Sequence, residues 1–391
     1  MYNSVELFSG AGGLALGLAA AGFHHEALIE WNAHACKTLR YNQKAGFSPV
    51  DRWNILEGDA RSFDFSRMKK IDLVAGGPPC QPFSLGGKHK AYDDKRDMFP
   101  VAVNAVRHLR PKAFVFENVK GLLRNAFTNY LQYVTLQLNH PDLIKGDSED
   151  WEDHLARLEQ HHTAGHVSSS EYRTVIRLLN AADYGVPQKR ERIFIVGFKS
   201  SLHTEWTFPK PTHSEDALIW AKWMTGEYWD EHGIPKRKRP QPTDYDNAQI
   251  DRVMKKYGMF GPTAQRWRTV RDAIVNLPET PLNHEIREGA RFYVGHTGSD
   301  IDEPAKTLKA GDHGVPGGEN MVRYPDDSVR YFSVRESCRL QTFPDDFYIS
   351  GSWTEGMRQI GNAVPVKLAE VVGHTIYQHL DAALNKADSA A

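Results

Sequence analysis

Short apolar runs alternate with amphipathic stretches through the first half of the chain. Each run gives way to a turn containing Gly, Asn or Pro, and the runs are Val5–Phe8, Ala27–Glu30, Ile71–Ala75 and Ala113–Glu117. Between them, apolar residues recur at helical spacing in Leu14–Ala21, Ala33–Asn42 and Pro100–Leu109. Strands that alternate with helices predict βαβ units, so the expected fold is α/β, with a mostly parallel sheet covered by helices on both faces.

The pattern changes after Phe198. Val175–Leu179 and Arg192–Phe198 predict two more strands, but residues 199–332 are rich in Pro, Trp, Gly and charge, with little periodicity. A helical pattern returns at Ser333 and leads through a loop into a long C-terminal helix. The sequence therefore predicts a discontinuous domain, 1–198 with 333–391, and a smaller, irregular, loop-dominated domain, 199–332.

The composition is that of an ordinary globular protein, with 40% hydrophobic and 25% charged residues. No apolar run reaches the roughly 18 residues that a membrane span needs, and no signal peptide is recognised, so we expect a cytoplasmic protein. The cysteines, Cys36, Cys80 and Cys338, are too few and too scattered for a disulfide framework or a zinc site. Because no histidine falls into a ligand spacing such as HExxH, no metal is expected.

Charge is distributed unevenly, although the net charge is only −1. Residues 235–271 hold ten basic and three acidic residues, whereas residues 142–162 hold seven acidic and two basic ones. This asymmetry is compatible with one face that meets phosphates and another that faces water. Charge runs are more often plain solvated surface, so the pattern is weak evidence alone.

A glycine-rich turn, GAGG, follows the first predicted strand and opens a helix of small residues. Such a turn lets the backbone approach a ligand beside the unpaired N–H groups of the helix, although a tight turn without a ligand is an equal alternative. Glu30 ends the second strand, where a carboxylate can bind ribose hydroxyls, and Asp59 follows in EGDA. Phe8 and Trp31 flank the turn and Glu30, and could enclose an adenine ring.

Three further strand ends hold reactive residues. Cys80 follows the stiff loop GGPP, which favours a nucleophile over a buried structural cysteine. Glu117 ends an apolar strand, where a carboxyl group can have a raised pKa and donate a proton. Arg190 and Arg192 are spaced to share one strand face and suit phosphate and a base carbonyl, the alternative being a surface ion-pair ladder.

Together these motifs resemble the DNA cytosine-5 methyltransferases. The match runs from Val5 to Gly197 and from Ser333 to about Gly373. In order along the chain, the matching segments are ELFSGAGG, IEWN, GDA, GGPPCQPFS, ENV, QKRERIFIVGF, RESCRLQTFPDDF and QIGNAVPV. The resemblance implies a Rossmann-like fold that uses S-adenosylmethionine, with residues 199–332 as a target-recognition domain.

The resemblance also implies roles for individual residues. Cys80 matches the nucleophile, Glu117 the acid at ring nitrogen 3, and Arg192 the ligand of the cytosine carbonyl, with Arg190 beside them as a phosphate or loop contact. The expected cofactor ligands are Phe8, Ser9, Gly10, Gly12, Glu30, Trp31, Asp59, Ala60, Pro79, Asn362 and Ala363. The expected DNA contacts are Gln81, Ser84, Arg96, Lys236, Arg237, Lys238, Arg239, Lys306, Lys309 and Arg323.

The implied activity is transfer of a methyl group from S-adenosylmethionine to carbon 5 of a flipped-out cytosine in double-stranded DNA. We expect a monomeric prokaryotic enzyme that protects DNA from a restriction endonuclease, to which it is linked only functionally. The chain departs from the family pattern at Glu6, at Ala363 and in an extra acidic, partly helical stretch, 139–170.

Three alternatives compete with this function. A methyltransferase of the tRNA branch usually has a CFT tripeptide, which this chain lacks. A catalytically inactive DNA-binding relative would lose the nucleophile loop or the ENV acid, and both are present. A nicotinamide-dependent dehydrogenase would need GxGxxG, whereas the spacing here is GxGG.

Overall fold

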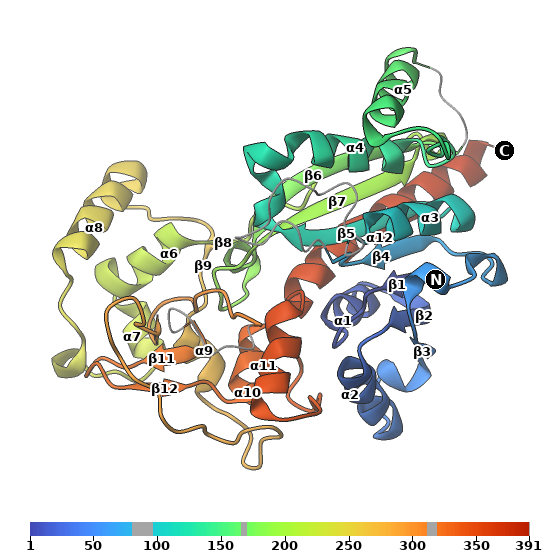
Figure 1. Ribbon diagram of the computed structural model, residues 1–391. Helices are drawn as coiled ribbons and strands as arrows, with labels where there is room; N and C mark the ends of the chain where they lie inside the picture. Colours follow the sequence, from blue (N-terminus) through green and yellow to red (C-terminus); the bar gives the residue numbers. More distant parts are fainter. Residues whose placement is uncertain (80–96, 166–169, 311–318, 391) are drawn as a thin grey trace. The chain divides into compact units, whose positions relative to one another are not determined.

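The computed structural model describes residues 1–79, 97–165, 170–310 and 319–390, and the chain forms two compact units (Figure 1). The first unit comprises residues 1–179, 191–209 and 369–391, and the second comprises 180–190 and 210–368. Among the described residues, no helix combines the length and the apolar character that a membrane span requires.

A seven-stranded sheet forms the centre of the first unit, in the order β3-β2-β1-β4-β5-β7-β6. The strands are β1 (Tyr2–Leu7), β2 (Phe23–Glu30), β3 (Ile55–Glu57), β4 (Leu73–Gly76), β5 (Ala113–Val119), β6 (Tyr172–Asn180) and β7 (Glu191–Lys199). The first five strands in this order, from β3 at the edge to β5, pair in parallel with their neighbours. Strand β7 is antiparallel to β5. The predicted α/β fold with a mostly parallel sheet is therefore confirmed, and the short strand β3 is an addition to the prediction.

Helices cover both faces of this sheet, because alternate residues of its strands point to opposite sides. Val5 and Leu7 belong to the same hydrophobic cluster as α3 (Phe99–Leu109) and α4 (Thr128–Asn139). Ser4 points the other way and bonds His25, whose Nε2 in turn bonds the Ala15 carbonyl of α1 (Gly13–Ala20). The first unit also contains α2 (Ala33–Lys44) and most of the C-terminal α12 (Val366–Ala390).

The extra stretch 139–170 is anchored on the first unit by its own small core. It contains α5 (Trp151–Thr163), which confirms the predicted helical part. Leu158 of α5 packs with Tyr133 and Leu136 of α4. Hydrogen bonds add to this contact, since His154 Nδ1 lies 2.8 Å from the Tyr133 hydroxyl.

The second unit is less irregular than the sequence indicated. Its helices are α6 (Glu215–Ile219), α7 (Glu227–Glu231), α8 (Asp244–Tyr257), α9 (Val270–Ile274), α10 (Val334–Leu340) and α11 (Trp353–Asn362). The expectation of a loop-dominated segment was wrong for α8, which begins with a capping box between Thr243 and Asp246. Tyr228, Trp229 and Trp267 form the centre of a small core in this unit.

The two compact units do not coincide with the predicted domain boundaries. Residues 333–368 were assigned to the first domain but belong to the second unit, as do residues 180–190. The reason is local packing: α10 contacts both α9 and α11, and Gln188 pairs with Ala305 in an isolated β-bridge. The division of labour between a catalytic and a recognition domain remains a prediction.

Candidate active site

The predicted reactive residues of the first unit follow the carboxyl ends of neighbouring parallel strands. The turn Phe8–Gly12 follows β1, Glu30 ends β2, Asp59 follows β3, and Gly77–Pro79 follow β4. In open α/β sheets this edge is where ligands bind. Glu117 belongs to the adjacent strand β5, so the fold brings these residues to one edge of the sheet, as the sequence predicted.

Glu30 is buried and fixes the glycine-rich turn. Its Oε2 accepts a hydrogen bond from the Gly10 N–H and its Oε1 accepts one from the Asn32 N–H, both at 2.7 Å. Each carboxylate oxygen can accept more than one hydrogen bond. Gly10 has a φ of 53°, and no atom of the described residues lies within 4 Å of the position that a Cβ would take there, which leaves the backbone accessible to a ligand.

Other residues around this turn fit an adenosine-bearing cofactor. The indole of Trp31 is 72% exposed, so its face is available for stacking, and Phe8 is half-buried with a φ of 56°. Ser9 Oγ is buried and has no hydrogen-bond partner among the described residues. An unsatisfied buried hydroxyl costs stability unless a ligand or water completes it.

Asp59 lies in a different electrostatic setting from Glu30. It caps the short helix Ala60–Ser62 and pairs with the Arg61 guanidinium at 2.5 Å. Hydrogen bonds from the Arg61 side chain and backbone lower the pKa of Asp59. Asp59 is therefore an anionic hydrogen-bond acceptor, which suits recognition of an amino group. In this structure its partner is Arg61. Ala60, which is buried, follows it directly.

Glu117 and Arg192 form a buried ion pair on the sheet. Arg192 Nε lies 2.8 Å from Glu117 Oε1, and the two side chains are 12% and 10% exposed. Because Glu117 lies opposite Phe194 in the antiparallel pair β5–β7, Arg192 is its diagonal neighbour on the same face. Burial lowers the pKa of Arg192, while Glu117 raises it. The pair presents a carboxyl and a guanidinium group side by side.

Asn118 connects β5 to the loop after β4. Its Nδ2 donates to the Pro78 carbonyl at 3.1 Å, and Gly77 lies against Glu117, because a Cβ added there would be 3.3 Å from Glu117 Oε2. A side chain at this position would require Glu117 to move by a few tenths of an ångström. Asn118 thus holds the backbone two residues before Cys80. The sequence marked Asn118 only as part of the ENV segment, and no role was predicted for it.

Cys80 itself lies outside the described residues, as do Gln81, Ser84 and Arg96. Pro79, the last described residue before this gap, is exposed, and its carbonyl accepts a hydrogen bond from the Met98 N–H at 3.3 Å. The roles predicted for the four residues therefore remain predictions.

Arg190 does not share a strand face with Arg192. Strand β7 begins at Glu191, and Arg190 belongs to the second unit, where it is fully buried. Its guanidinium donates to the carbonyls of Leu308, Gly361 and Ala363 at 3.3, 2.7 and 2.9 Å. Of the two predicted roles, these bonds fit a contact with loops of the protein, because a phosphate could reach Arg190 only by displacing them in a buried site.

The position of Arg190 also bears on Asn362 and Ala363, two predicted cofactor ligands. Asn362 is the last residue of α11 and is exposed, whereas Ala363 is buried and its carbonyl is bonded to Arg190. Both belong to the second unit, so their part in a cofactor site remains a prediction.

Most of the predicted DNA-contact residues of the second unit are exposed. Lys236, Arg237 and Lys238 form an exposed 3-10 turn after Pro235. Arg239 is different, since its side chain is 16% exposed and bonds Asp230 and the Ile234 carbonyl. The first three cations thus remain available to phosphate, whereas Arg239 stabilises its own loop.

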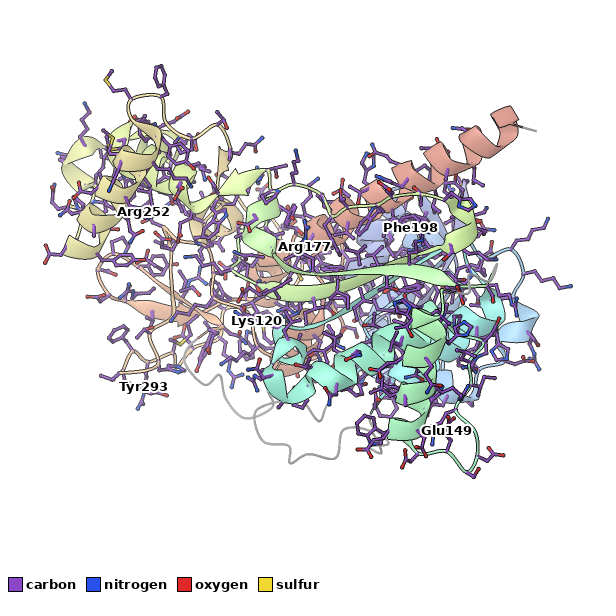
Figure 2. The ribbon with its side chains drawn as sticks, turned by 90° about the horizontal axis from the view of Figure 1, so that it is seen from above. Lys120, Glu149, Arg177, Phe198, Arg252 and Tyr293 are labelled. Carbon is purple, nitrogen blue, oxygen red and sulfur yellow. The ribbon has the colours of Figure 1, made fainter. Side chains whose placement is uncertain are left out.

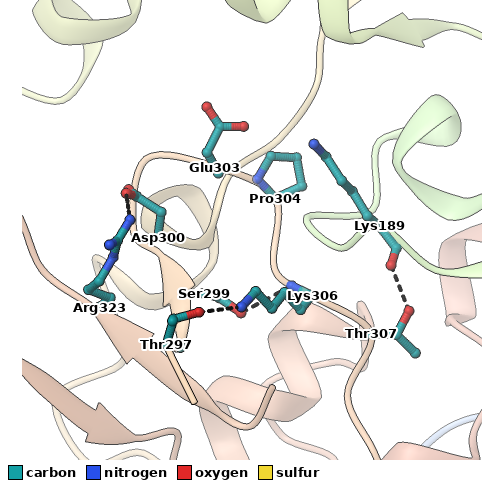
Figure 3. Close-up of a pocket in the computed structure, with 10 residues that line it drawn as sticks. Lys189, Thr297, Ser299, Asp300, Glu303, Pro304, Lys306, Thr307 and Arg323 are labelled. Atoms are coloured by element: carbon teal, nitrogen blue, oxygen red, sulfur yellow. Dashed lines mark hydrogen bonds and ion pairs between the residues drawn. The ribbon is translucent and has the colours of Figure 1, made fainter. Parts of the chain in front are cut away.

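A pocket of about 590 Å³ in the second unit contains two more of these residues (Figure 3). Lys306 reaches Thr297 Oγ1 at 2.8 Å, and Arg323 pairs with Asp300 at 3.1 Å. Lys309, outside the pocket lining, pairs with Glu319 at 2.6 Å. The cations here stand among carboxylates, so this surface is of mixed charge, unlike the turn 236–238.

The comparisons with known proteins agree with this geometry. The family model described as C-5 cytosine-specific DNA methylase matches residues 2–142 and 154–378. The chain is 33% identical to the type II methyltransferase M.PspPI of Psychrobacter sp. (strain TA137), covering 98% of this chain and 80% of that one. It is 32% identical to M.NgoMIV of Neisseria gonorrhoeae, with 97% and 98% covered.

Solved structures share the fold at lower identity. A putative DNA modification methyltransferase encoded within an E. coli prophage superposes with a TM-score of 0.59 and 21% identity, covering 97% of this chain and all of that one. The Dnmt2 methyltransferase of S. pombe superposes with a TM-score of 0.55 and 16% identity, with 98% and 99% covered. The sheet and these superpositions thus define a Rossmann-like methyltransferase fold.

Within that class the family assignment is more specific. The family model matches most of the chain, and curated relatives match it over nearly its full length. The chain belongs to the C-5 cytosine-specific DNA methylase family.

Proposed function

We propose that this chain is a sequence-specific DNA (cytosine-5) methyltransferase that acts on a flipped-out cytosine in duplex DNA. The observation that carries the proposal is the buried pair of Glu117 and Arg192, held against the loop that leads into Cys80. A carboxyl and a guanidinium side by side complement the ring nitrogen 3 and carbonyl edge of cytosine. Membership of the DNA methylase family supports the same substrate.

The residues divide the chemistry among them. The Cys80 thiolate forms a bond to carbon 6, while a proton shared with Glu117 at ring nitrogen 3 balances the added electron pair. Arg192 holds the carbonyl and thereby orients the ring. Bound S-adenosylmethionine supplies the methyl group that carbon 5 takes up. Loss of the proton from carbon 5 to a base then lets the carbon–sulfur bond break, which releases Cys80 as thiolate and restores the aromatic ring.

The cofactor site proposed here consists of the turn after β1 and the ends of β2 and β3. Glu30 would accept bonds from the ribose hydroxyls, Phe8 and Trp31 would enclose the adenine, and Asp59 would accept from its amino group. The backbone of Ser9, Gly10, Gly12, Ala60 and Pro79 would complete the first unit's share. Two features support this placement: the open space at Gly10, and the Ser9 hydroxyl, which has no partner within the described part of the chain.

The second unit is proposed to recognise the target sequence. The exposed cations Lys236, Arg237 and Lys238 would bind phosphate, which fixes register without reading sequence. Side chains of 302–330 would contact base edges. Because named relatives are type II methyltransferases, we propose a modification enzyme of a restriction–modification system, acting as a cytoplasmic monomer on DNA.

The test is methyl transfer by wild type, Cys80→Ala and Glu117→Gln to unmethylated bacterial DNA, followed by bisulfite sequencing. The wild type should mark cytosines within one short sequence, Cys80→Ala should mark none, and Glu117→Gln should lose most of its rate. A duplex with 5-fluorocytosine at the mapped site should trap wild type covalently, because fluorine cannot leave as a proton. Methylation by Cys80→Ala, or by wild type of transfer RNA in preference to DNA, would refute the proposal.

A further inference from the structure

Three histidines and a glutamate meet where the extra stretch 139–170 joins the first unit. His140 is the C-cap of α4, His161 and His162 lie in the last turn of α5, and Glu171 directly precedes β6. Sequence spacing gave no indication of this cluster, because the fold brings together residues that are up to 31 positions apart. Neither the family chemistry nor the proposed DNA-binding surface uses it.

The distances within the cluster are short. Glu171 Oε1 lies 3.1 Å from His140 Nδ1 and 2.9 Å from His161 Nε2. One ligand atom from each of the three residues lies within 4.8 Å of the others. On the far side of its ring, His140 Nε2 lies 3.0 Å from His162 Nδ1.

Two of the three separations are close to those in the first coordination sphere of zinc. With zinc–nitrogen bonds of about 2.0–2.1 Å, two ligand atoms of a tetrahedral site are about 3.3 Å apart. Two pairs of the cluster are already within about half an ångström of that value, so only the separation between His140 and His161 has to adjust. With zinc on Nδ1, the Nε2–H of His140 would donate to His162 Nδ1, which is the kind of second contact that orients a ligating imidazole.

Burial and charge also suit a dication. The His140 and Glu171 side chains are 6% and 9% exposed, whereas His161 is 29% exposed. The cluster thus has two fixed ligands in the interior and a third at its mouth, which leaves a coordination position for water. Two neutral imidazoles and one carboxylate would leave a bound zinc ion with a single net positive charge.

We propose that His140 Nδ1, His161 Nε2 and Glu171 Oε1 form a zinc site that fastens the helix of the extra stretch to the edge of the sheet. The ion would link the ends of α4 and α5 to the start of β6. In its middle, α5 is already held by Leu158 in the small core and by the ion pair of Arg157 with Glu149. Glu149 is labelled beside this helix in Figure 2. The site would therefore be structural, not part of methyl transfer.

The competing explanation is a hydrogen-bonded chain without metal. In that case His162 donates to His140, and both His140 and His161 donate to Glu171. The two explanations differ over Glu171→Gln. Glutamine keeps an oxygen that accepts hydrogen bonds, so the chain of bonds survives, but the anionic ligand of the proposed zinc site is replaced by a neutral amide.

The experiment uses the full chain, stripped of metal with a chelator and titrated with Zn²⁺ in competition with a chromophoric indicator. Wild type should bind one Zn²⁺ per chain with high affinity and unfold at a higher temperature when Zn²⁺ is present. His161→Ala and Glu171→Gln should each weaken binding at least tenfold and abolish the thermal shift. His161 is the partly exposed ligand, so its removal is compatible with folding, which circular dichroism verifies.

The matched control is His108→Ala, which removes an exposed histidine of α3 in the same unit and should bind Zn²⁺ as wild type does. The proposal is overturned if wild type shows no zinc-dependent thermal shift. It is equally overturned if either ligand variant keeps wild-type affinity, because zinc would then be bound elsewhere. None of these readouts involves methyl transfer, so the result is independent of the proposed function.

Discussion

Glu30 shows how one side chain can serve both the fold and a ligand. Its two oxygens hold the N–H groups of Gly10 and Asn32, so the glycine-rich turn has its shape before any cofactor binds. Such preorganisation lowers the cost of ordering the loop on binding. A substitution at Glu30 therefore affects both the turn and its ligand.

The prediction for Glu30→Gln is a cofactor affinity lowered by about tenfold, equivalent to about 1.4 kcal/mol, because a charged acceptor is replaced by a neutral one. Isothermal titration with S-adenosylmethionine measures it. Glu57→Gln is the control, since Glu57 is an exposed carboxylate on β3, paired with Arg40, and should leave affinity unchanged. Equal losses in both variants would remove Glu30 from the proposed site.

A second residue-scale prediction concerns His25, buried between Ser4 and the Ala15 carbonyl. Burial lowers its pKa from 6.5 to about 4. Between pH 6.5 and 4 the unfolded chain binds a proton that the folded chain does not. Stability should therefore fall by about 1.4 kcal/mol per pH unit as the pH drops through this window, and His25 contributes nothing to the slope above it.

Urea unfolding of wild type and His25→Gln at pH 7 and pH 5 isolates this contribution, because the other titrating groups are common to both proteins. Wild type should lose about 2 kcal/mol more than the variant over that interval. Parallel losses in the two proteins would show that His25 is protonated in the folded state as readily as in the unfolded one.

At the scale of elements, α8 of the second unit depends on its N-cap and on polar contacts more than on an apolar face. Helix α8 buries only Val253, and its charged face is tied to α6 through Asp216, which pairs with Arg252 and Lys256. A helix with so little apolar contact derives much of its stability from its ends.

Removal of the N-cap should therefore lower the stability of α8 itself. Thr243→Ala removes one side of the capping box and should destabilise α8 by about 1 kcal/mol, which accelerates amide exchange in residues 244–257 about fivefold. Thr243→Ser keeps the hydroxyl and should exchange as wild type does. Exchange measured by mass spectrometry would contradict the cap's role if both variants behaved alike.

The strands and helices show which parts of the fold could be predicted from the sequence and which could not. The buried strands were recognisable because continuous apolar runs ending at Gly, Asn or Pro are typical of central parallel strands. The helix α8 was missed because its pattern is almost wholly polar, although TDYD at its start was a readable capping signal. Arg190 was misplaced because alternation holds only inside a strand, and β7 begins one residue later.

The candidate site divides in the same way. Glu30, Asp59 and Glu117 were predictable, since strand ends of a parallel sheet share an edge. The Asn118 bond to Pro78 and the histidine cluster were not, because they depend on side chains that meet only after the chain has folded. Spacing in the sequence contains no information on such contacts.

For the whole molecule, the proposed DNA binding should separate into a salt-sensitive and a sequence-sensitive part. The double variant Lys236→Ala/Lys238→Ala should weaken binding to all duplexes alike and reduce the salt slope by about 0.9 for each phosphate that is no longer neutralised. Its preference for the cognate sequence should survive. Titrations of cognate and singly mismatched duplexes at several salt concentrations measure both quantities.

Lys145→Ala is the control, because Lys145 lies in the acidic stretch of the first unit and bonds the Glu149 carbonyl. It should change neither the slope nor the preference. The double variant could instead keep the salt slope and no longer distinguish the cognate duplex from one mismatched at a single base pair. In that case the turn 236–238 would contact bases and not phosphates.

The second unit is formed by two separate segments of the chain, and this limits how it can be exchanged between relatives. The second unit is built from 180–190 and 210–368, and its two pieces are joined by the Gln188–Ala305 bridge and by the bonds of Arg190 to Leu308, Gly361 and Ala363. A chimera that transplanted only 199–332 would separate Gln188 from Ala305 and Arg190 from Leu308, so the buried guanidinium would meet one foreign carbonyl in place of the Leu308 carbonyl. A transplant that moved both pieces together would keep the bonds intact. In an engineered hybrid, therefore, residues 180–190 have to be transplanted together with the rest of the second unit.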